Sequence, residues 1–147
     1  MDERIPQRSR ELFDSGFYCA ESVLLAMAES KGIKSEFIPG IATGFCGGIS
    51  GTCGICGAVS GAIMGLNLFT GRNSPEETVD KNYKLVRQLI GMFKGKFGST
   101  NCEELTGCNL GTEEGLQAFR ESGQNEKCRE YTGEAVRMAM LLLEDES

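Results

Sequence analysis

Hydrophobic positions recur along the chain every three or four residues, and no stretch shows the alternating pattern of a β-strand. This spacing puts apolar side chains on one face of an α-helix, where they can pack against a neighbour. We therefore expect residues 1–147 to form a single all-α domain, a bundle of about five to seven helices with a central buried glycine-rich helix. The expected helices cover residues 3–14, 18–31, 36–43, 55–70, 75–97 and 126–143, with short helical turns near Cys102 and Thr112.

The expected central helix, residues 55–70, carries glycine at every fourth position of one face. Gly57, Gly61 and Gly65 leave that face nearly bare backbone. Each glycine in a helix interior costs about 1 kcal/mol relative to alanine, so three of them predict a gain from close packing elsewhere. A face of this kind lets a neighbouring helix approach closely.

Local signals predict two helix starts and one loop. Ser35 is expected to cap the third of these helices, and Ser74, Pro75 and Glu77 are typical of the start of the fifth. The glycine-rich segment 43–54 predicts a flexible loop.

Charge and composition narrow the classes of function. The chain has a formal net charge of −6 and a sequence pI of about 4.8, without a run of Lys or Arg long enough for a basic patch. We therefore expect no nucleic-acid partner and no binding to anionic membrane surfaces. The N-terminal residues lack the apolar segment of a signal peptide, and the longest apolar run, residues 55–69, is too short to span a bilayer. These features predict a cytoplasmic protein without membrane insertion.

Cysteine is the residue type that carries the most chemical information. The chain has seven cysteines and no histidine. The absence of histidine excludes Ser–His and Cys–His catalytic pairs, mixed Cys/His zinc sites and c-type haem attachment, so no haem is expected. An odd number of cysteines in a reducing compartment favours reactive or metal-bound thiols over a structural disulfide framework. Sulfur is therefore the expected agent of any special chemistry.

Cys53 and Cys56 stand close together before the central helix, in the spacing of a CxxC redox pair. A thioredoxin-like motif depends on a βαβ setting, and none is predicted here. Both residues could equally be small side chains in a loop and a packed helix, since free cysteine packs like a modest hydrophobe. The spacing alone therefore does not establish a redox pair.

Four cysteines share one local setting. Cys19, Cys56, Cys102 and Cys128 each lie within about one turn of an expected helix N-terminus, where unpaired N–H groups and the helix dipole stabilise an anion. We therefore expect lowered thiol pKa values at these positions. The two long helices in the middle of the chain are joined by a short turn, so they should pack antiparallel and return Cys102 to the end that carries Cys56.

The sequence around these four cysteines resembles a known family. The motif C-G-A-x-x-G is present at residues 56–61 as CGAVSG, together with GFYCAESVLLA around Cys19, NCEELTG around Cys102 and EKCREYTGEAV around Cys128. Over nearly its whole length the chain resembles the small redox-active proteins named C_GCAxxG_C_C. The resemblance implies a mostly helical bundle of anaerobic bacteria and archaea with a redox role. Outside the four-cysteine pattern lie Cys46, Cys53 and Cys108.

The leading expectation is a redox-active protein that uses cysteine thiols for thiol–disulfide or electron-transfer chemistry. Cys56 is the candidate central thiolate, and Cys19, Cys102 and Cys128 are its candidate partners. The alternative is a binding module in which the same four cysteines ligate an iron–sulfur cluster or a metal such as zinc, without catalytic turnover. A helical interaction protein whose cysteines only pack is a third reading. We expect a redox partner protein of unknown identity, and a homo-oligomer is left open.

Overall fold

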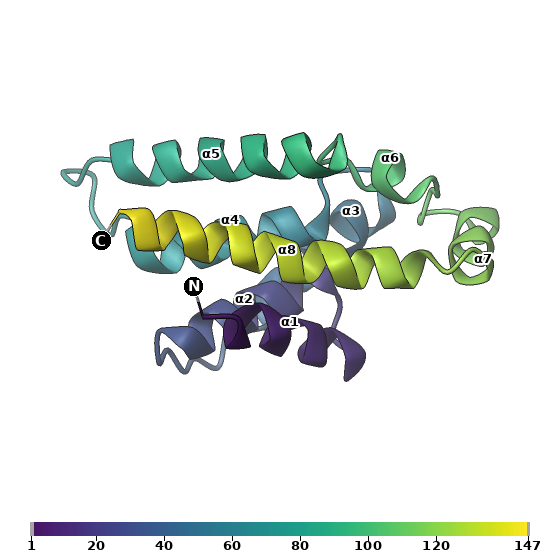
Figure 1. The fold of residues 1–147 in the computed structure, drawn as a ribbon, viewed down its shortest axis with the longest axis horizontal. Helices are drawn as coiled ribbons and strands as arrows, with labels where there is room; N and C mark the ends of the chain where they lie inside the picture. Colours follow the sequence, from purple (N-terminus) through teal and green to yellow (C-terminus); the bar gives the residue numbers. More distant parts are fainter. Residues whose placement is uncertain (1, 147) are drawn as a thin grey trace.

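The computed structural model describes residues 2–146, which form an all-helical protein (Figure 1). The expected all-α class is confirmed. Within these residues the β-type pairing is limited to an isolated antiparallel bridge between Ile55 and Asn101. The elements in chain order are α1 (Arg4–Asp14), α2 (Cys19–Ser30), the 3₁₀ helix η1 (Gly40–Phe45), α3 (Cys46–Gly51), α4 (Gly57–Thr70), α5 (Asp80–Phe97), α6 (Cys102–Thr106), α7 (Glu113–Glu121) and α8 (Gln124–Asp145).

The long helix α8 runs along the length of the molecule and contacts α1, α2, α4 and α5. In Figure 1, α5 lies beside it on one side, and α1 and α2 lie on the other. α4 packs against α2, α5 and α8. The end of α8 lies toward one end of the molecule, whereas α3, α6 and α7 lie toward the opposite end. The short helices α3, α6 and α7 therefore lie at one end of the molecule.

The main core is built from apolar side chains of α2, α4, α5 and α8. A smaller apolar cluster lies between α2 and η1 and includes Ala20, Leu24, Ala42 and Cys46. Full burial of a large apolar side chain contributes about 1.5–3 kcal/mol, so these faces hold the helices together. Fully buried members of the main core include Met27, Val59, Leu66, Leu89, Phe93 and Val136.

α4 and α2 pack backbone to backbone through the glycine face of α4. A Cβ atom added to Gly61 would lie 2.7 Å from the Ala20 carbonyl oxygen, and one added to Gly65 would overlap the Met27 sulfur. Any side chain at these positions would push α2 away. The approach of α2 to α4 therefore depends on glycine.

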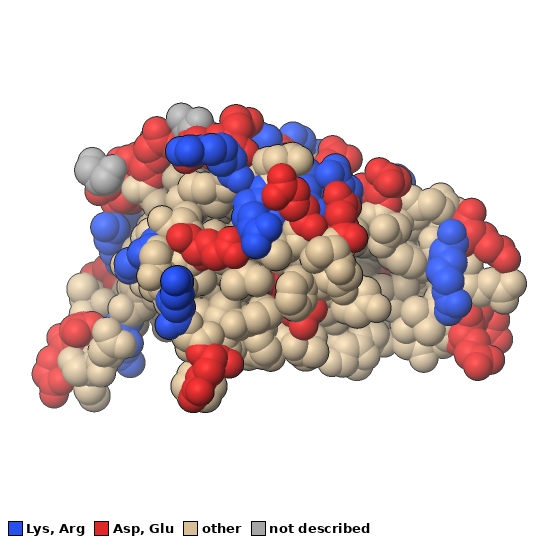
Figure 2. Space-filling view, turned by 90° about the horizontal axis from the view of Figure 1, so that it is seen from below, with Lys and Arg blue, Asp and Glu red and all other residues tan. Residues whose placement is uncertain are grey.

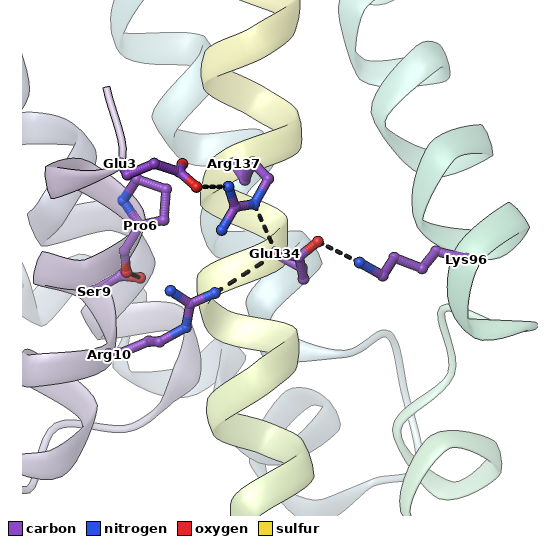
Figure 3. A network of polar contacts seen from close by, with 7 residues as sticks. All are labelled: Glu3, Pro6, Ser9, Arg10, Lys96, Glu134 and Arg137. Carbon is purple, nitrogen blue, oxygen red and sulfur yellow. Dashed lines mark hydrogen bonds and ion pairs between the residues drawn. The ribbon is translucent and has the colours of Figure 1, made fainter. Parts of the chain in front are cut away.

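A buried carboxylate links three helices (Figure 3). Glu134 of α8 is 9 % exposed, and it accepts hydrogen bonds from Lys96 Nζ of α5 at 2.5 Å and from Arg137 Nε at 2.8 Å. Arg10 Nη2 of α1 lies 3.6 Å from the same carboxylate, and Arg137 also pairs with Glu3. Burial acts to raise the pKa of Glu134, but the hydrogen bonds from Lys96 and Arg137 outweigh it and hold the pKa below its ordinary value. The charged carboxylate thus joins α1, α5 and α8.

Two predicted helix starts are wrong. The segment before η1 forms turns, because Pro39 has no N–H to donate and disfavours a helical conformation at the residue before it. α5 begins later than predicted, because the Glu77 carboxylate accepts the N–H of Asn73 at 2.9 Å instead of capping a helix. Thr78 Oγ1 accepts the N–H of Asp80 at 3.1 Å, and the helix starts there.

The glycine-rich segment before α4 has a defined conformation, where the sequence predicts a flexible loop. Left-handed backbone costs a non-glycine residue about 1–2 kcal/mol, so Ile49 and Ser50 are held there by their surroundings. The N–H of Gly54 donates to the Gly48 carbonyl at 2.8 Å, and the Ser50 hydroxyl donates to the Gly44 carbonyl at 2.9 Å. α3 is one left-handed turn, with φ of 65° at Gly47, 66° at Gly48, 60° at Ile49, 56° at Ser50 and 77° at Gly51.

The surface mixes charges of both signs. On the face seen in Figure 2, Lys and Arg side chains are interspersed with Asp and Glu, and a broad area beside them carries few charges. Between residues 2 and 146, no helix combines the length and the apolar character needed to cross a membrane.

Candidate functional site

All cysteines of the chain are free thiols, and they lie on the short helices, on the connecting segments and near the starts of the long helices. The starts of α2 and α4, together with α3 and α6, lie toward the same end of the molecule in Figure 1. The thiols are those of Cys19, Cys46, Cys53, Cys56, Cys102, Cys108 and Cys128.

Cys19 is the first residue of α2, and its thiol contacts Cys46. The N–H of Tyr18 donates to the Glu21 carboxylate at 3.0 Å, which fixes the start of α2 at Cys19. Cys46 is 7 % exposed. Interaction with the Cys19 thiol is the largest cause that raises the pKa of Cys46 above its ordinary value, and burial is the second. Two thiols from separate segments are thus direct neighbours.

Cys56 is the N-cap residue of α4 and is buried. Its N–H donates to the Thr100 carbonyl at 2.6 Å, next to the bridge between Ile55 and Asn101. These bonds tie the start of α4 to the segment that follows α5. The predicted return of Cys102 to the Cys56 end of the bundle is therefore confirmed.

Cys102 is the first residue of α6, and the segment of the left-handed turn holds it in place. Its N–H donates to the Gly54 carbonyl at 2.9 Å. Asn101 caps α6, because its side chain accepts the N–H of Glu104 at 3.1 Å and donates to the Cys53 carbonyl at 2.7 Å. The segments before α4 and α6 therefore form one hydrogen-bonded unit.

Cys128 comes to the site from α8, less than one turn before Tyr131. The Tyr131 hydroxyl donates to the Leu105 carbonyl of α6 at 3.1 Å, and its ring packs edge-on against Phe97 of α5 with 4.8 Å between the ring centroids. These contacts fix this part of α8 against α6. Besides burial, negative charge on Cys128 and on Cys102 raises the pKa of Cys56, so the three thiols are electrostatically coupled.

Burial makes these thiols weaker acids than the sequence predicts. It raises the pKa of Cys56 to about 12, although the N–H groups of Ala58 and Val59 at the start of α4 act in the opposite direction. Burial is also the largest cause that raises the pKa of Cys128 to about 12 and the pKa of Cys102 above its ordinary value. The expectation of lowered pKa values is wrong for these three thiols, because lost hydration outweighs the helix dipole.

Comparison with known proteins relates this arrangement to a family. Residues 17–142 match the family described as "Putative redox-active protein (C_GCAxxG_C_C)". The chain belongs to the C_GCAxxG_C_C family. It is also similar to an uncharacterized protein of Archaeoglobus fulgidus, with 31% identity over 155 residues that cover 98% of this chain and 96% of the relative. No solved structure matches the chain.

The four cysteines of the C_GCAxxG_C_C pattern come from four different helix starts or helix faces. Cys56, Cys102 and Cys128 form the coupled group, and the Cys19 sulfur lies against Gly57. A Cβ atom on Gly57 would overlap the Cys19 sulfur and lie 3.2 Å from the Cys46 Cα. The glycine that follows the motif cysteine therefore provides the space in which Cys19 rests.

Two thiols outside the C_GCAxxG_C_C pattern join the site, and sequence reasoning left both aside. Cys46 contacts Cys19, and negative charge on Cys108 acts together with burial to raise the pKa of both Cys102 and Cys128. Neither residue lies on a periodic helix face in the sequence. The abundance of cysteine without histidine was the signal that could have included them.

Cys53 has a different environment from its CxxC partner. It lies in the segment before α4 with φ of 60°, and its thiol is partly exposed. Partial burial, followed by the charge of Glu103, raises the pKa of Cys53. Cys53 interacts electrostatically with Glu103 and Cys102.

The donor set has the right chemistry for a soft metal but not a converged geometry. Thiolates are the ligands that zinc and iron–sulfur clusters prefer. Within residues 2–146, no three Cys, Asp or Glu side chains are placed together to hold a metal ion.

Proposed function

We propose that this protein stores and transfers electrons through reversible dithiol–disulfide chemistry of its cysteines, in the cytoplasm, with a redox partner protein. A disulfide holds two oxidising equivalents, and thiol–disulfide exchange passes them on through a mixed disulfide. The observation that supports the proposal is the position of Cys56, which is coupled to Cys102 and Cys128 and is followed by Gly57, against which the Cys19 sulfur lies.

The position of Cys56 supports a central role for this residue. It is coupled to Cys102 and Cys128, and it precedes Gly57, on which Cys19 rests. Electrons passing between the two sets of thiols would therefore cross the start of α4. Its buried thiol is protonated at neutral pH, because burial raises its pKa to about 12. Cys56 would then react after a more accessible thiol has formed the first bond to a partner.

Exposure divides the thiols of the pattern into two kinds. Cys19 and Cys128 are partly exposed, whereas Cys56 and Cys102 are buried. Attack on an external disulfide requires access as well as thiolate character. Access therefore favours the partly exposed thiols as the points of entry, and the buried thiols would complete the exchange. The formal net charge of −6 supports a protein partner over nucleic acid.

The second candidate function is an iron–sulfur cluster or zinc site without catalytic turnover. It is supported by the coupling of Cys56, Cys102 and Cys128, which puts three soft donors in one region. Binding would require the segment around the left-handed turn to move, since the described side chains do not converge on one ion. The function would then be electron transfer or structural metal binding rather than thiol exchange.

One experiment separates the two candidates. The full chain is purified anaerobically, its visible spectrum and its iron, sulfide and zinc content are measured, and its alkylatable thiols are counted before and after reduction. A colourless, metal-free protein whose thiol count rises on reduction after mild oxidation supports dithiol chemistry. A coloured product that contains iron and sulfide would replace the first proposal by the second. Seven thiols that stay reduced under oxidant, in a metal-free protein, would refute both.

A further inference from the structure

We propose that Cys19 and Cys46 are the pair of thiols that exchanges with an external disulfide, with Cys19 as the attacking thiol and Cys46 as the resolving thiol. This inference rests on the proposed dithiol chemistry and names the residues that begin it. Cys46 is not part of the C_GCAxxG_C_C pattern, so the pattern alone does not suggest it.

The contact between the two thiols is the first argument. Cys19 starts α2, and Cys46 starts α3, yet the Cys19 sulfur and the Cys46 Cα both lie next to the Cβ position of Gly57. The Cys46 thiol donates to the carbonyl oxygen of Ala42 in η1 at 3.8 Å. Cys46 belongs to the small apolar cluster between α2 and η1, and Cys19 packs against that cluster. Packing of α2 against η1 therefore holds Cys19 and Cys46 close to each other.

Gly57 provides the second argument, since it lies next to both Cys19 and Cys46. A side chain at this position would collide with the Cys19 sulfur and would approach the Phe45 carbonyl to 3.0 Å and the Cys46 Cα to 3.2 Å. Both members of the pair thus rest against the start of α4. The geometry of the pair and the packing of α4 depend on the same glycine.

Unequal access assigns the two roles. Cys19 is partly exposed, between Tyr18, which is 67 % exposed, and the buried interior of α2. Cys46 is buried, whereas Phe45, the residue before it, is 40 % exposed. An external disulfide can reach the Cys19 sulfur first, and Cys46 can reach only the sulfur that is next to it.

The exchange with an organic disulfide R–S–S–R balances as follows. The Cys19 thiolate attacks one sulfur, so that a Cys19–S–S–R bond forms and one R–S⁻ leaves. The Cys46 thiolate then attacks the Cys19 sulfur, so that the Cys19–Cys46 disulfide forms and the second R–S⁻ leaves. The external disulfide gains two electrons, the two cysteines lose two, and the protons given up by Cys19 and Cys46 pass to the leaving thiolates.

The test uses the full reduced chain with oxidised glutathione under anaerobic conditions. Remaining thiols are blocked with iodoacetamide, and tryptic peptides are analysed by mass spectrometry. Peptide 11–31 contains Cys19, and peptide 35–72 contains Cys46, Cys53 and Cys56. We expect these two peptides to be linked, and fragmentation of the linked species in the wild-type protein to locate the bond at Cys46.

Two variants sharpen the result. In Cys46→Ala the linked species should fall by about tenfold or more, and peptide 11–31 should accumulate with glutathione on Cys19, because the first step proceeds without a resolving thiol. In the matched control Cys53→Ala, which removes another cysteine of the same peptide, the link should form as in the wild type.

Outcomes that overturn the inference differ from those that overturn the proposed function. A link from Cys19 to Cys53 or Cys56, or disulfides formed without Cys19, would refute the assignment and leave the dithiol function standing. A wild-type protein that forms no disulfide and no glutathione adduct would refute both. Location of the bond in the wild-type protein does not depend on whether a variant folds.

Discussion

A methyl group at Gly61 tests the claim that α2 and α4 pack backbone to backbone. In Gly61→Ala the new Cβ would lie 2.7 Å from the Ala20 carbonyl oxygen and 3.0 Å from the Val23 Cβ. Both distances are shorter than the 3.5–4.0 Å or so at which non-bonded carbon atoms attract each other. The Ala20 contact involves backbone, so it can be relieved only by moving one helix away from the other.

The expected net effect is a destabilisation of about 1–2 kcal/mol. Overpacking of a core costs about 1–3 kcal/mol, and alanine recovers about 1 kcal/mol of helix propensity relative to glycine. The cost should fall in the upper half of its range, because backbone must shift. At about 3 °C for each kcal/mol in a chain of this size, the melting temperature should fall by about 3–6 °C.

A second glycine provides the matched control. Gly91 lies within α5 and is exposed, and a Cβ atom there would have nothing within 4 Å. Gly91→Ala should therefore stabilise the protein by about 0.5–1 kcal/mol through helix propensity alone. The same substitution of glycine by alanine should therefore lower the stability at position 61 and raise it at position 91.

Urea unfolding followed by circular dichroism, under reducing conditions, measures both variants. Reduction keeps disulfides out of the comparison. If Gly61→Ala were as stable as the wild type, or as stable as Gly91→Ala, the close contact between α2 and α4 would not exist as described.

Three further predictions concern charge, pH and backbone strain. Burial raises the pKa of Cys56 and of Cys128 to about 12, so the stability that their neutral forms provide is fully present below about pH 9 and is lost as pH rises toward 12. Urea midpoints and ultraviolet thiolate absorbance at increasing pH should show this loss. Glu134→Gln should cost about 2 kcal/mol by chemical denaturation, because three cationic side chains lose their shared carboxylate. Ile49→Gly should stabilise the left-handed turn by about 1 kcal/mol in the same assay, since Ile49 has φ of 60°.

Each of these predictions has a contrary result. Thiolate absorbance that develops fully near pH 9 in the folded protein would contradict burial of Cys56 and Cys128. A Glu134→Gln variant with wild-type stability would show that its ion pairs balance their own desolvation cost. An Ile49→Gly variant that is less stable than the wild type would mean that packing of the isoleucine outweighs the strain.

The positions of most helices, and of the cysteines relative to the helix starts, could be predicted from the sequence, because helical periodicity is a local property. The sequence predicts a helical turn near Thr112, which is the N-cap of α7, and the end of α5 at Phe97. The start of α5 could not be predicted in this way. The Glu77 carboxylate could accept the N–H of Ser74, as in a capping box, or the N–H of Asn73, and only the folded turn brings it to Asn73. The left-handed turn at Ile49 is stabilised by hydrogen bonds between segments, so composition suggested only a loop.

The sequence by itself determined that this protein is helical, that it is rich in cysteine and which family it belongs to. These properties depend on spacing, composition and a local motif, which require no knowledge of distant contacts. Only the tertiary structure decided that Cys46 contacts Cys19 and that burial raises the pKa of Cys56 and Cys102. The local helix dipole favours a thiolate, but the packing of other helices removes water from the same sulfur, and lost hydration is the larger effect.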